Sequence, residues 1–463
     1  MSIATELQDL NDNILDAYTA VQTKGGTVPA NKNMDNLDDA ITSIPSGGGR
    51  WAYDIHTKRS TSDQAEFVRD YDDTPPTIST PFLPATITKI GEGALIYAYR
   101  YFPHVTPEVR IGINLDSITS IGTGGMYYAF APDQIPGQFT SSSKIKDVSF
   151  RNLTTVGSYG LTHAFAYSQM ESLDFTNLET VGTNSLQEFS RRTYGVLDEA
   201  NFPALTSVDT YSFHRAFYDP VNSQSGVKKA SFPSLVHADK AQAFAECFRG
   251  NKILQTVDFS ALKTVGQNAT GLSYADSTFY YAFEGCTSLT SVDFSSLESI
   301  YASSTNGRQF SYAFSGCTGL TSIDLSSLTS VTGSYSFNKA FYGCTSLVSA
   351  DFRALTSIGS YAFSYIFQNC SSLTSVRFDA LADLTTSRIF NYAFQNCTSL
   401  TSLSFPSLTT SSFSSYTNQF ERMLSGCSNV TVHFPAAIQS TIGNWGDVTN
   451  GFGGTNTTVL FDL

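Results

Sequence analysis

The sequence predicts a repeat solenoid: a parallel β-sheet with one short strand per unit, short helical or 3-10 turns on the opposite wall, and about 12 units. An N-terminal α-helical or coiled-coil segment is expected to precede it. Two observations support the solenoid. Similar segments recur at intervals of 25 to 35 residues, and each contains a short alternating run closed by Phe or Leu. Such periods are typical of stacked units that bury their apolar faces only against one another.

The repeat is clearest in the C-terminal half of the chain. Residues 282–294 read AFEGCTSLTSVDF, and 313–325, 340–352 and 393–405 vary this pattern only slightly. The residue that closes each unit falls at Leu115, Phe150, Phe175, Phe202, Phe232, Phe259, Phe294, Leu325, Phe352, Phe378, Phe405 and Phe434.

Each unit contains an L-x-x-V-x-F core, such as Leu289, Val292 and Phe294. Here Val292 and Phe294 alternate with Ser291 and Asp293, which is the period of a strand with one buried face. An aromatic-rich segment that ends in Ala-Phe precedes this core. We expect that segment to form the helical or 3-10 turn behind the sheet.

Seven cysteines occur, and six share one repeated context: Cys286, Cys317, Cys344, Cys370, Cys397 and Cys427. No C-x-x-C pair exists, which gives little support to a zinc or redox site. A free Cys that recurs once per unit is most often a buried structural thiol. Disulfides or metal ligands are the alternative.

The A-F-x-x-C-x-x-L-x-x-V/I-x-F/L units resemble the BspA-type leucine-rich repeat over residues 85–434. Units before residue 250 lack the repeated Cys, so their register is less certain. The resemblance implies a surface and adhesion scaffold of the kind found in bacterial surface proteins and in some phage and protist proteins. It implies binding rather than catalysis.

The N-terminal segment shows a different pattern. Apolar residues alternate in steps of four and three, as in a coiled-coil seam, at Ile3, Leu7, Leu10, Ile14, Ala17 and Val21. A second short helix is expected at 34–44. The pattern favours a homo-oligomer, a trimer or a dimer, or docking on another protein. The alternative is a monomeric helical hairpin that caps the solenoid.

The same segment resembles the N-terminal module of tail-associated proteins in phages of Gram-positive bacteria. The helix, the run KGGTVPAN at 24–31 and the spaced apolar residues at 34–44 carry this likeness. It implies attachment to other virion or tail proteins through residues 1–45. It also implies a place in the virion, in a tail or surface appendage, after synthesis in the host cytoplasm. The acidic N-terminus lacks the pattern of a secretion signal, which agrees with that expectation.

The expected domain organisation follows from these segments. Residues 1–45 form the helical assembly or attachment segment, and 46–50 form a Gly-rich linker. Residues 51–84 form an N-terminal cap, 85–434 the solenoid and 435–463 a C-terminal cap. Caps are expected because an open sheet edge exposes unpaired backbone.

Composition excludes several functions. The formal net charge is −13, from 40 acidic and 27 basic residues, which argues against a nucleic acid partner. No apolar run reaches the length that membrane insertion requires. No metalloprotease, nucleophile-elbow or P-loop motif occurs. We therefore predict a protein that is not an enzyme and that has no cofactor, catalytic residue or metal site.

One outward column carries charge. The position before the closing residue is Asp258, Asp293, Asp324 and Asp351 in four consecutive units, and then Arg377. The outward position two residues earlier is small and hydroxylated, as at Ser291, Ser322 and Ser375. These eight residues are the candidate ligand-binding face. The alternative is a solvated acidic stripe with no ligand, beside Ser residues that keep the strand face soluble.

Together these patterns predict a phage tail-fibre or receptor-binding protein that adheres to a glycan or protein of the bacterial surface. A bacterial BspA-like cell-surface adhesin is the first alternative. A virion decoration protein with a purely structural role is the second.

Deleting residues 1–45 is expected to leave a folded, soluble monomer with an almost unchanged melting temperature, because repeat stability is a sum of nearest-neighbour terms. Replacing Leu10 and Ile14 with Asp should likewise dissociate the oligomer, since a charge in the seam lacks a partner. Light scattering and thermal melts measure both effects. A full-length chain that is already monomeric with no partner bound, or a truncated chain that unfolds, would contradict the expectation.

Overall fold

The computed structural model describes residues 88–95, 111–131, 145–220, 224–266, 277–302, 307–413, 418–442 and 451–463, together with the backbone of 51–52 and 68–69. The predicted helical segment at 1–45, the linker at 46–50 and most of the predicted cap at 51–84 lie outside the described residues. The coiled-coil seam and the likeness to phage tail-associated proteins therefore stay predictions.

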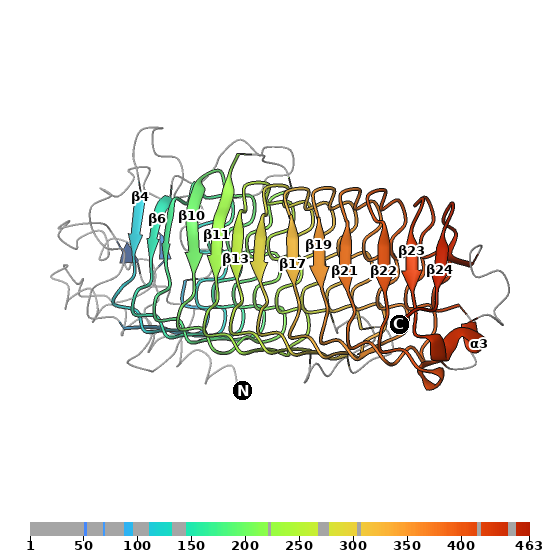
Figure 1. Cartoon of the computed structure of the whole chain (residues 1–463). Helices are drawn as coiled ribbons and strands as arrows, with labels where there is room; N and C mark the ends of the chain where they lie inside the picture. Colours follow the sequence, from blue (N-terminus) through green and yellow to red (C-terminus); the bar gives the residue numbers. More distant parts are fainter. Residues whose placement is uncertain are drawn as a thin grey trace, which may run out of the picture.

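The chain winds into a solenoid whose coils visit three walls. Figure 1 shows the strands of the first wall side by side along the molecule, from β4 to β24. The first wall consists of β4 (Ile111–Asn114), β6 (Ile145–Ser149), β8 (Ser172–Asp174), β10 (Val196–Asn201), β11 (Gly226–Ser231), β13 (Thr256–Asp258), β15 (Ser291–Asp293), β17 (Ser322–Asp324), β19 (Ser349–Asp351), β21 (Ser375–Arg377), β22 (Ser402–Ser404), β23 (Thr431–His433) and β24 (Thr458–Leu460).

The second wall is narrower and follows the first in each coil. Its two-residue strands are β3 (Lys89–Ile90), β5 (Ser120–Ile121), β7 (Thr155–Val156), β9 (Thr180–Val181), β12 (His237–Ala238), β14 (Thr264–Val265), β16 (Ser299–Ile300), β18 (Ser330–Val331) and β20 (Ser357–Ile358). Strand pairing in both walls is parallel, as where β14 pairs with β16, and the pairing of β4 with β6 contains a register shift between Ile111 and Gly112. A separate antiparallel pair joins β1 (Trp51–Ala52) and β2 (Val68–Arg69).

The predicted strand positions are confirmed. Each of the twelve predicted closing residues comes directly after a strand of the first wall, from Leu115 after β4 to Phe434 after β23. The units before residue 250, whose register was uncertain from sequence, follow the same rule. One more strand, β24, precedes Phe461 in the same way, within the region predicted to close the C-terminal end.

The third wall, called the turn wall, leads from the second wall back to the first. The prediction of helical or 3-10 turns there is wrong. The Ala282 and Glu284 amides donate to carbonyls three residues back, at 3.1 and 3.2 Å, but the Phe283 amide between them donates to Ala313 of the next coil. Tyr281 N–H likewise donates to Ser311 of the next coil. A 3-10 helix needs every amide to bond within the segment, so this wall is a chain of β-turns tied sideways to its neighbours.

Helix among the described residues is confined to η1 (Thr410–Ser412), η2 (Ala436–Ile438), α3 (Gln439–Ile442) and residues 451–452. None of the described helices is long and apolar enough to cross a bilayer.

Columns of stacked Phe rings fill the core. In the closing column, the ring centroids of Phe232 and Phe259 lie 4.9 Å apart, and those of Phe259 and Phe294 lie 5.4 Å apart. A second column behind the turn wall places Phe283, Phe314 and Phe341 at successive distances of 5.1 Å. These rings are at most 1% exposed. Each coil therefore buries its apolar face against equivalent residues of the next coil.

The repeated cysteines have a structural role, as predicted. All seven are buried and free. Cys317 Sγ donates to the Phe283 carbonyl of the preceding coil at 3.0 Å, and the other five repeated thiols do the same with equivalent carbonyls. Burial raises the pKa of the Cys317 thiol well above its ordinary value, so these thiols are poor nucleophiles and poor metal ligands in the folded protein.

Replacing Phe294 with Ala is expected to destabilise the array by about 3–5 kcal/mol, because it opens a cavity between Phe259 and its neighbours. Phe294→Leu is the matched control, since Leu325 occupies the same position one coil later. The control should cost clearly less. Urea denaturation followed by circular dichroism measures both losses. Equal losses in the two variants would show that cavity volume does not set the cost.

Candidate binding surfaces

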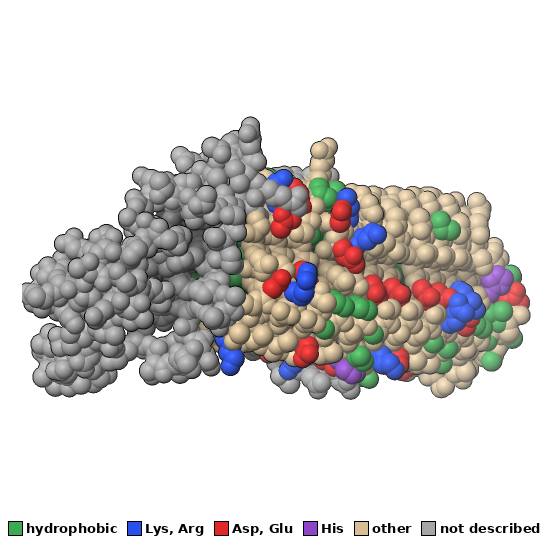
Figure 2. Space-filling model, turned by 90° about the vertical axis from the view of Figure 1, so that its left-hand side faces the viewer, with side chains coloured by type: hydrophobic (Ala, Val, Ile, Leu, Met, Phe, Trp, Pro, Cys, Tyr) green, Lys and Arg blue, Asp and Glu red, His purple; other side chains and the backbone are tan. Residues whose placement is uncertain are grey.

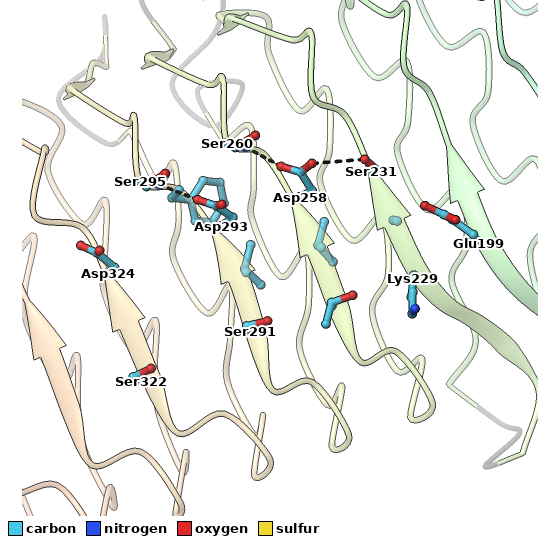
Figure 3. Close-up of a pocket in the computed structure, with 15 residues that line it drawn as sticks. Glu199, Lys229, Ser231, Asp258, Ser260, Ser291, Asp293, Ser295, Ser322 and Asp324 are labelled. Carbon is cyan, nitrogen blue, oxygen red and sulfur yellow. Dashed lines mark hydrogen bonds between the residues drawn. The ribbon is translucent and has the colours of Figure 1, made fainter.

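The first wall brings the predicted acidic column together. Asp258 pairs in register with Asp293, and Asp324 pairs with Asp351. Figure 3 shows Asp258, Asp293 and Asp324 at the same level of three neighbouring strands. Asp351 pairs with Arg377, so the column changes sign where the sequence predicted. In the view of Figure 2, acidic side chains form a row across an otherwise largely uncharged surface.

Each of the four carboxylates has a local structural partner. One oxygen accepts the backbone N–H two residues later, at 2.8 Å for Asp258, 2.9 Å for Asp293 and Asp324, and 3.1 Å for Asp351. An Asp whose side chain bonds this amide forms an Asx-turn. The strand therefore ends in a turn that favours Asp, and this explains why Asp recurs at the position.

Arginines relieve the repulsion at one end of the column. Arg353 donates its guanidinium to Asp351, and this hydrogen bond lowers the pKa of the Asp351 carboxyl. Arg377 pairs with Asp379 beyond the closing residue. No group of three His, Cys, Asp or Glu side chains among the described residues could hold a metal ion. These contacts favour the interpretation as a solvated acidic stripe with a role in turn formation.

The predicted hydroxyl column lies beside the acidic one. Ser291 pairs with Thr256, and Ser322, Ser349 and Ser375 are successive partners. Together the two columns line a shallow, open hollow over β11, β13, β15 and β17 (Figure 3). Lys229 and Glu199 border its N-terminal side. The hollow is broad and flat, so it could contact an extended ligand but encloses no small molecule.

A second outward surface was missed by the sequence reasoning. On the turn wall, several coils contain two or three non-Gly residues with a positive φ, and one series of them, with one member per coil, has φ between 50° and 58°. Hydrogen bonds between coils place these residues in one column, called the left-handed column. Its members are Tyr128, His163, Glu188, Arg215, Glu246, Tyr281, Tyr312, Lys339, Tyr365, Tyr392 and Arg422.

The C-terminal half of this column is aromatic and cationic. Tyr281 stacks on Tyr312 with ring centroids 4.7 Å apart, and Tyr365 stacks on Tyr392 at 5.0 Å. Lys339 stands between the two pairs, with Nζ 5.4 Å from the Tyr312 ring and 5.4 Å from the Tyr365 ring. This is cation–π geometry. The sequence shows a Tyr before Ala-Phe in several units. It does not indicate that these Tyr rings stack on the outer surface, because the left-handed backbone that places them there is rare for Tyr.

The N-terminal half of the column is an ion-pair network. Glu188 accepts from His163 at 2.9 Å and from Arg191 at 2.6 Å. Arg215 lies 3.7 Å from Glu188 and 2.8 Å from Glu246. Burial alone would raise the pKa of the Glu188 carboxyl, but the His163 hydrogen bond and the nearby cations outweigh it and lower the pKa to about 2. The same kind of contacts lower the pKa of Glu246.

Comparison with known proteins identifies the repeats. Residues 245–365 and 311–444 match the family model described as the BspA type leucine rich repeat region, which is matched in six copies. This part of the chain is therefore similar to the BspA-type leucine-rich repeat. The match begins near Cys247 and covers the units with the repeated Cys. No curated protein matches the chain.

Solved structures similar to this chain include other leucine-rich repeat proteins. A leucine-rich repeat protein of T. pallidum is 21% identical, and the match covers 50% of this chain and 86% of that one, with a TM-score of 0.30. A leucine-rich repeat protein of Eubacterium ventriosum is 17% identical over 76% of this chain and 84% of that one, with a TM-score of 0.31.

Because Asn also accepts the turn bond, Asp293→Asn should keep the BspA-type repeat as stable as the wild type or slightly more stable, since one repulsive charge is removed. Asp293→Ala should lose about 1 kcal/mol with the hydrogen bond. Thermal melts compare the two, and millimolar Ca²⁺ should shift neither melt nor that of the wild type. A Ca²⁺-dependent rise that both variants lose would instead indicate a cation site.

Acid is expected to weaken the ion-pair network. The folded-state pKa of Glu188 is about 2 against an ordinary 4.5, so its contribution to stability is present above about pH 4.5 and is lost as the pH falls towards 2. Melts at pH 6 and pH 3 should show a smaller fall for Glu188→Gln than for the wild type. Glu298→Gln, in an exposed pair with Lys263, should fall as the wild type does. Equal falls in all three proteins would mean that Glu188 is not coupled to folding.

Proposed function

We propose that this protein is a non-enzymatic adhesion protein whose solenoid presents its outer columns to a glycan or protein on a bacterial surface. One observation carries the proposal. Stacked Phe, Leu and Cys residues fill the described core, whereas the outer face of each wall repeats polar side chains at the strand spacing over many coils. Such a scaffold favours contact with an extended ligand over enclosure of a small substrate.

Two biological settings fit this function. The BspA-type repeat match favours a cell-surface adhesin of a bacterium. The resemblance of residues 1–45 to tail-associated proteins favours a phage tail-fibre or receptor-binding protein, which would attach to the virion through that segment. In the second setting residues 1–45 would join copies into a trimer or dimer, and several solenoids would bind one surface together. A purely structural decoration protein would have no ligand.

Binding to whole bacterial cells tests the proposal. Fluorescently labelled full-length protein is mixed with a panel of Gram-positive and Gram-negative cells, and bound fluorescence is measured by flow cytometry. We expect saturable binding to some strains, competed by unlabelled protein. A chain lacking residues 1–45 should bind the same strains more weakly, because linked copies gain avidity. Absence of saturable binding to every strain of the panel would favour the purely structural role.

Separate experiments distinguish the two biological settings from each other without testing adhesion itself. Pull-down of a phage tail protein by residues 1–45 fused to a carrier would favour the virion setting. Recovery of the protein in the cell-wall fraction of a bacterium would favour the adhesin. Either result is compatible with adhesion through the solenoid, whereas the cell-binding result decides adhesion itself.

A further inference from the structure

The turn wall from residue 307 onward differs in charge from the rest of the molecule. Its segments span 307–320, 333–347, 359–373, 385–400 and 418–430. They contain four basic residues and one acidic residue, a net charge of +3, in a chain whose formal net charge is −13. The basic residues are Arg308, Lys339, Arg388 and Arg422, and the acidic residue is Glu421.

All four cations are held over Tyr rings. Arg308 lies 5.8 Å from the Tyr335 ring centroid, and Arg388 lies 5.7 Å from that of Tyr361. Lys339 lies between two rings of the left-handed column, as described above. Arg422 lies 5.7 Å from the Tyr392 ring centroid and donates to its hydroxyl at 2.6 Å. The cations are therefore positioned before any ligand arrives.

Two of these charges have no carboxylate partner. Among the described residues, neither Lys339 nor Arg422 forms an ion pair, whereas Arg388 lies 3.5 Å from Glu421. The first-wall arginines behave differently, because Arg353 and Arg377 are each paired with an Asp two residues away. A charge held in place without a counter-charge is what an anionic ligand requires.

Amide side chains on the same wall supply hydrogen-bonding groups. Asn396 Nδ2 donates to Asn369 Oδ1 at 2.8 Å, and Gln368 Nε2 donates to Gln395 Oε1 at 2.7 Å. Each of these pairs joins adjacent coils. An amide has two donor hydrogens and an acceptor oxygen, so both pairs keep unused capacity for sugar hydroxyls.

We propose that the turn wall over residues 307–430 binds an extended anionic glycan that is less densely charged than duplex DNA, such as a polyuronate, along the axis of the solenoid. This inference rests on the proposed adhesion function and names its surface and ligand class. Arg308 and Arg422 are four coils apart, or about 19 Å at the usual strand spacing of about 4.8 Å. A net charge of three over that length suits a polymer whose carboxylates are more widely spaced than the phosphates of duplex DNA. Duplex DNA carries about one charge per 1.7 Å, and the acidic remainder of the chain would repel it.

The test measures binding of the full-length protein to immobilised alginate, a linear polyuronate, by biolayer interferometry. Neutral dextran and duplex DNA are the comparison polymers. The key variant is Lys339→Gln/Arg422→Gln. The matched control is Arg353→Gln/Arg377→Gln, which removes the same charge from the first wall. Melting curves establish that each variant is folded.

We expect the wild type to bind alginate, to bind dextran and DNA at least tenfold more weakly, and to lose alginate affinity as salt rises. The turn-wall variant should lose about tenfold in affinity, the effect of two exposed ion pairs, and the control should stay within about twofold. Lys339→Arg/Arg422→Lys should restore binding if the variant effect reflects charge rather than a disturbed wall.

Several results would overturn the inference: no alginate binding, equal binding of dextran, equal or tighter binding of DNA, or an equal loss in the first-wall control. If the protein binds cells but fails these tests, adhesion stands and uses another surface or ligand. If it binds alginate through the turn wall but binds no cells, the ligand class stands and the adhesion proposal fails.

Discussion

The structure depends on in-register stacking of equivalent residues. Backbone hydrogen bonds join each coil to its neighbours in all three walls. On the turn wall only every second amide is available for this, because the amides between them close β-turns. A shift of one residue would exchange the two sets of amides and move the Phe rings out of their columns. Register is therefore enforced simultaneously by turn geometry, hydrogen bonding and apolar burial.

Stacking in register turns every repeated residue into a column, inside and outside. In the core, a repeated Phe or Cys stabilises the fold, because the Phe rings stack and each repeated thiol donates a hydrogen bond to a carbonyl of the preceding coil. On the outer surface, a repeated charge destabilises the fold because like charges in adjacent coils repel. The walls reduce this repulsion in different ways. The first wall uses the Asp side chains in turns and ends the column with Arg377. The left-handed column alternates Glu188, Arg215 and Glu246, so that like charges are not neighbours.

The sequence predicted the strands well because their signal is local and repeated. The positions of Leu115 and Phe434 followed from an alternating pattern that burial imposes on every unit, and the buried Cys followed from its fixed place in that pattern. The turn wall could not be predicted in the same way. Its amides bond across coils about 30 residues apart, as Tyr281 does with Ser311, and left-handed φ at Tyr opposes its intrinsic preference. Only tertiary hydrogen bonding stabilises it.

The same reasoning separates scaffold from surface. A residue that repeats in every coil can be explained by stacking alone, as the Asp residues of the first wall are by their turns. Departures from the repeat are more informative about binding. Lys339 stands between two stacked Tyr pairs and Arg422 follows the last Tyr, and among the described residues neither cation forms an ion pair. Continued ring stacking would serve the scaffold at least as well without burying part of a cation. These two cations are therefore the basis of the proposal that the turn wall binds an anionic ligand.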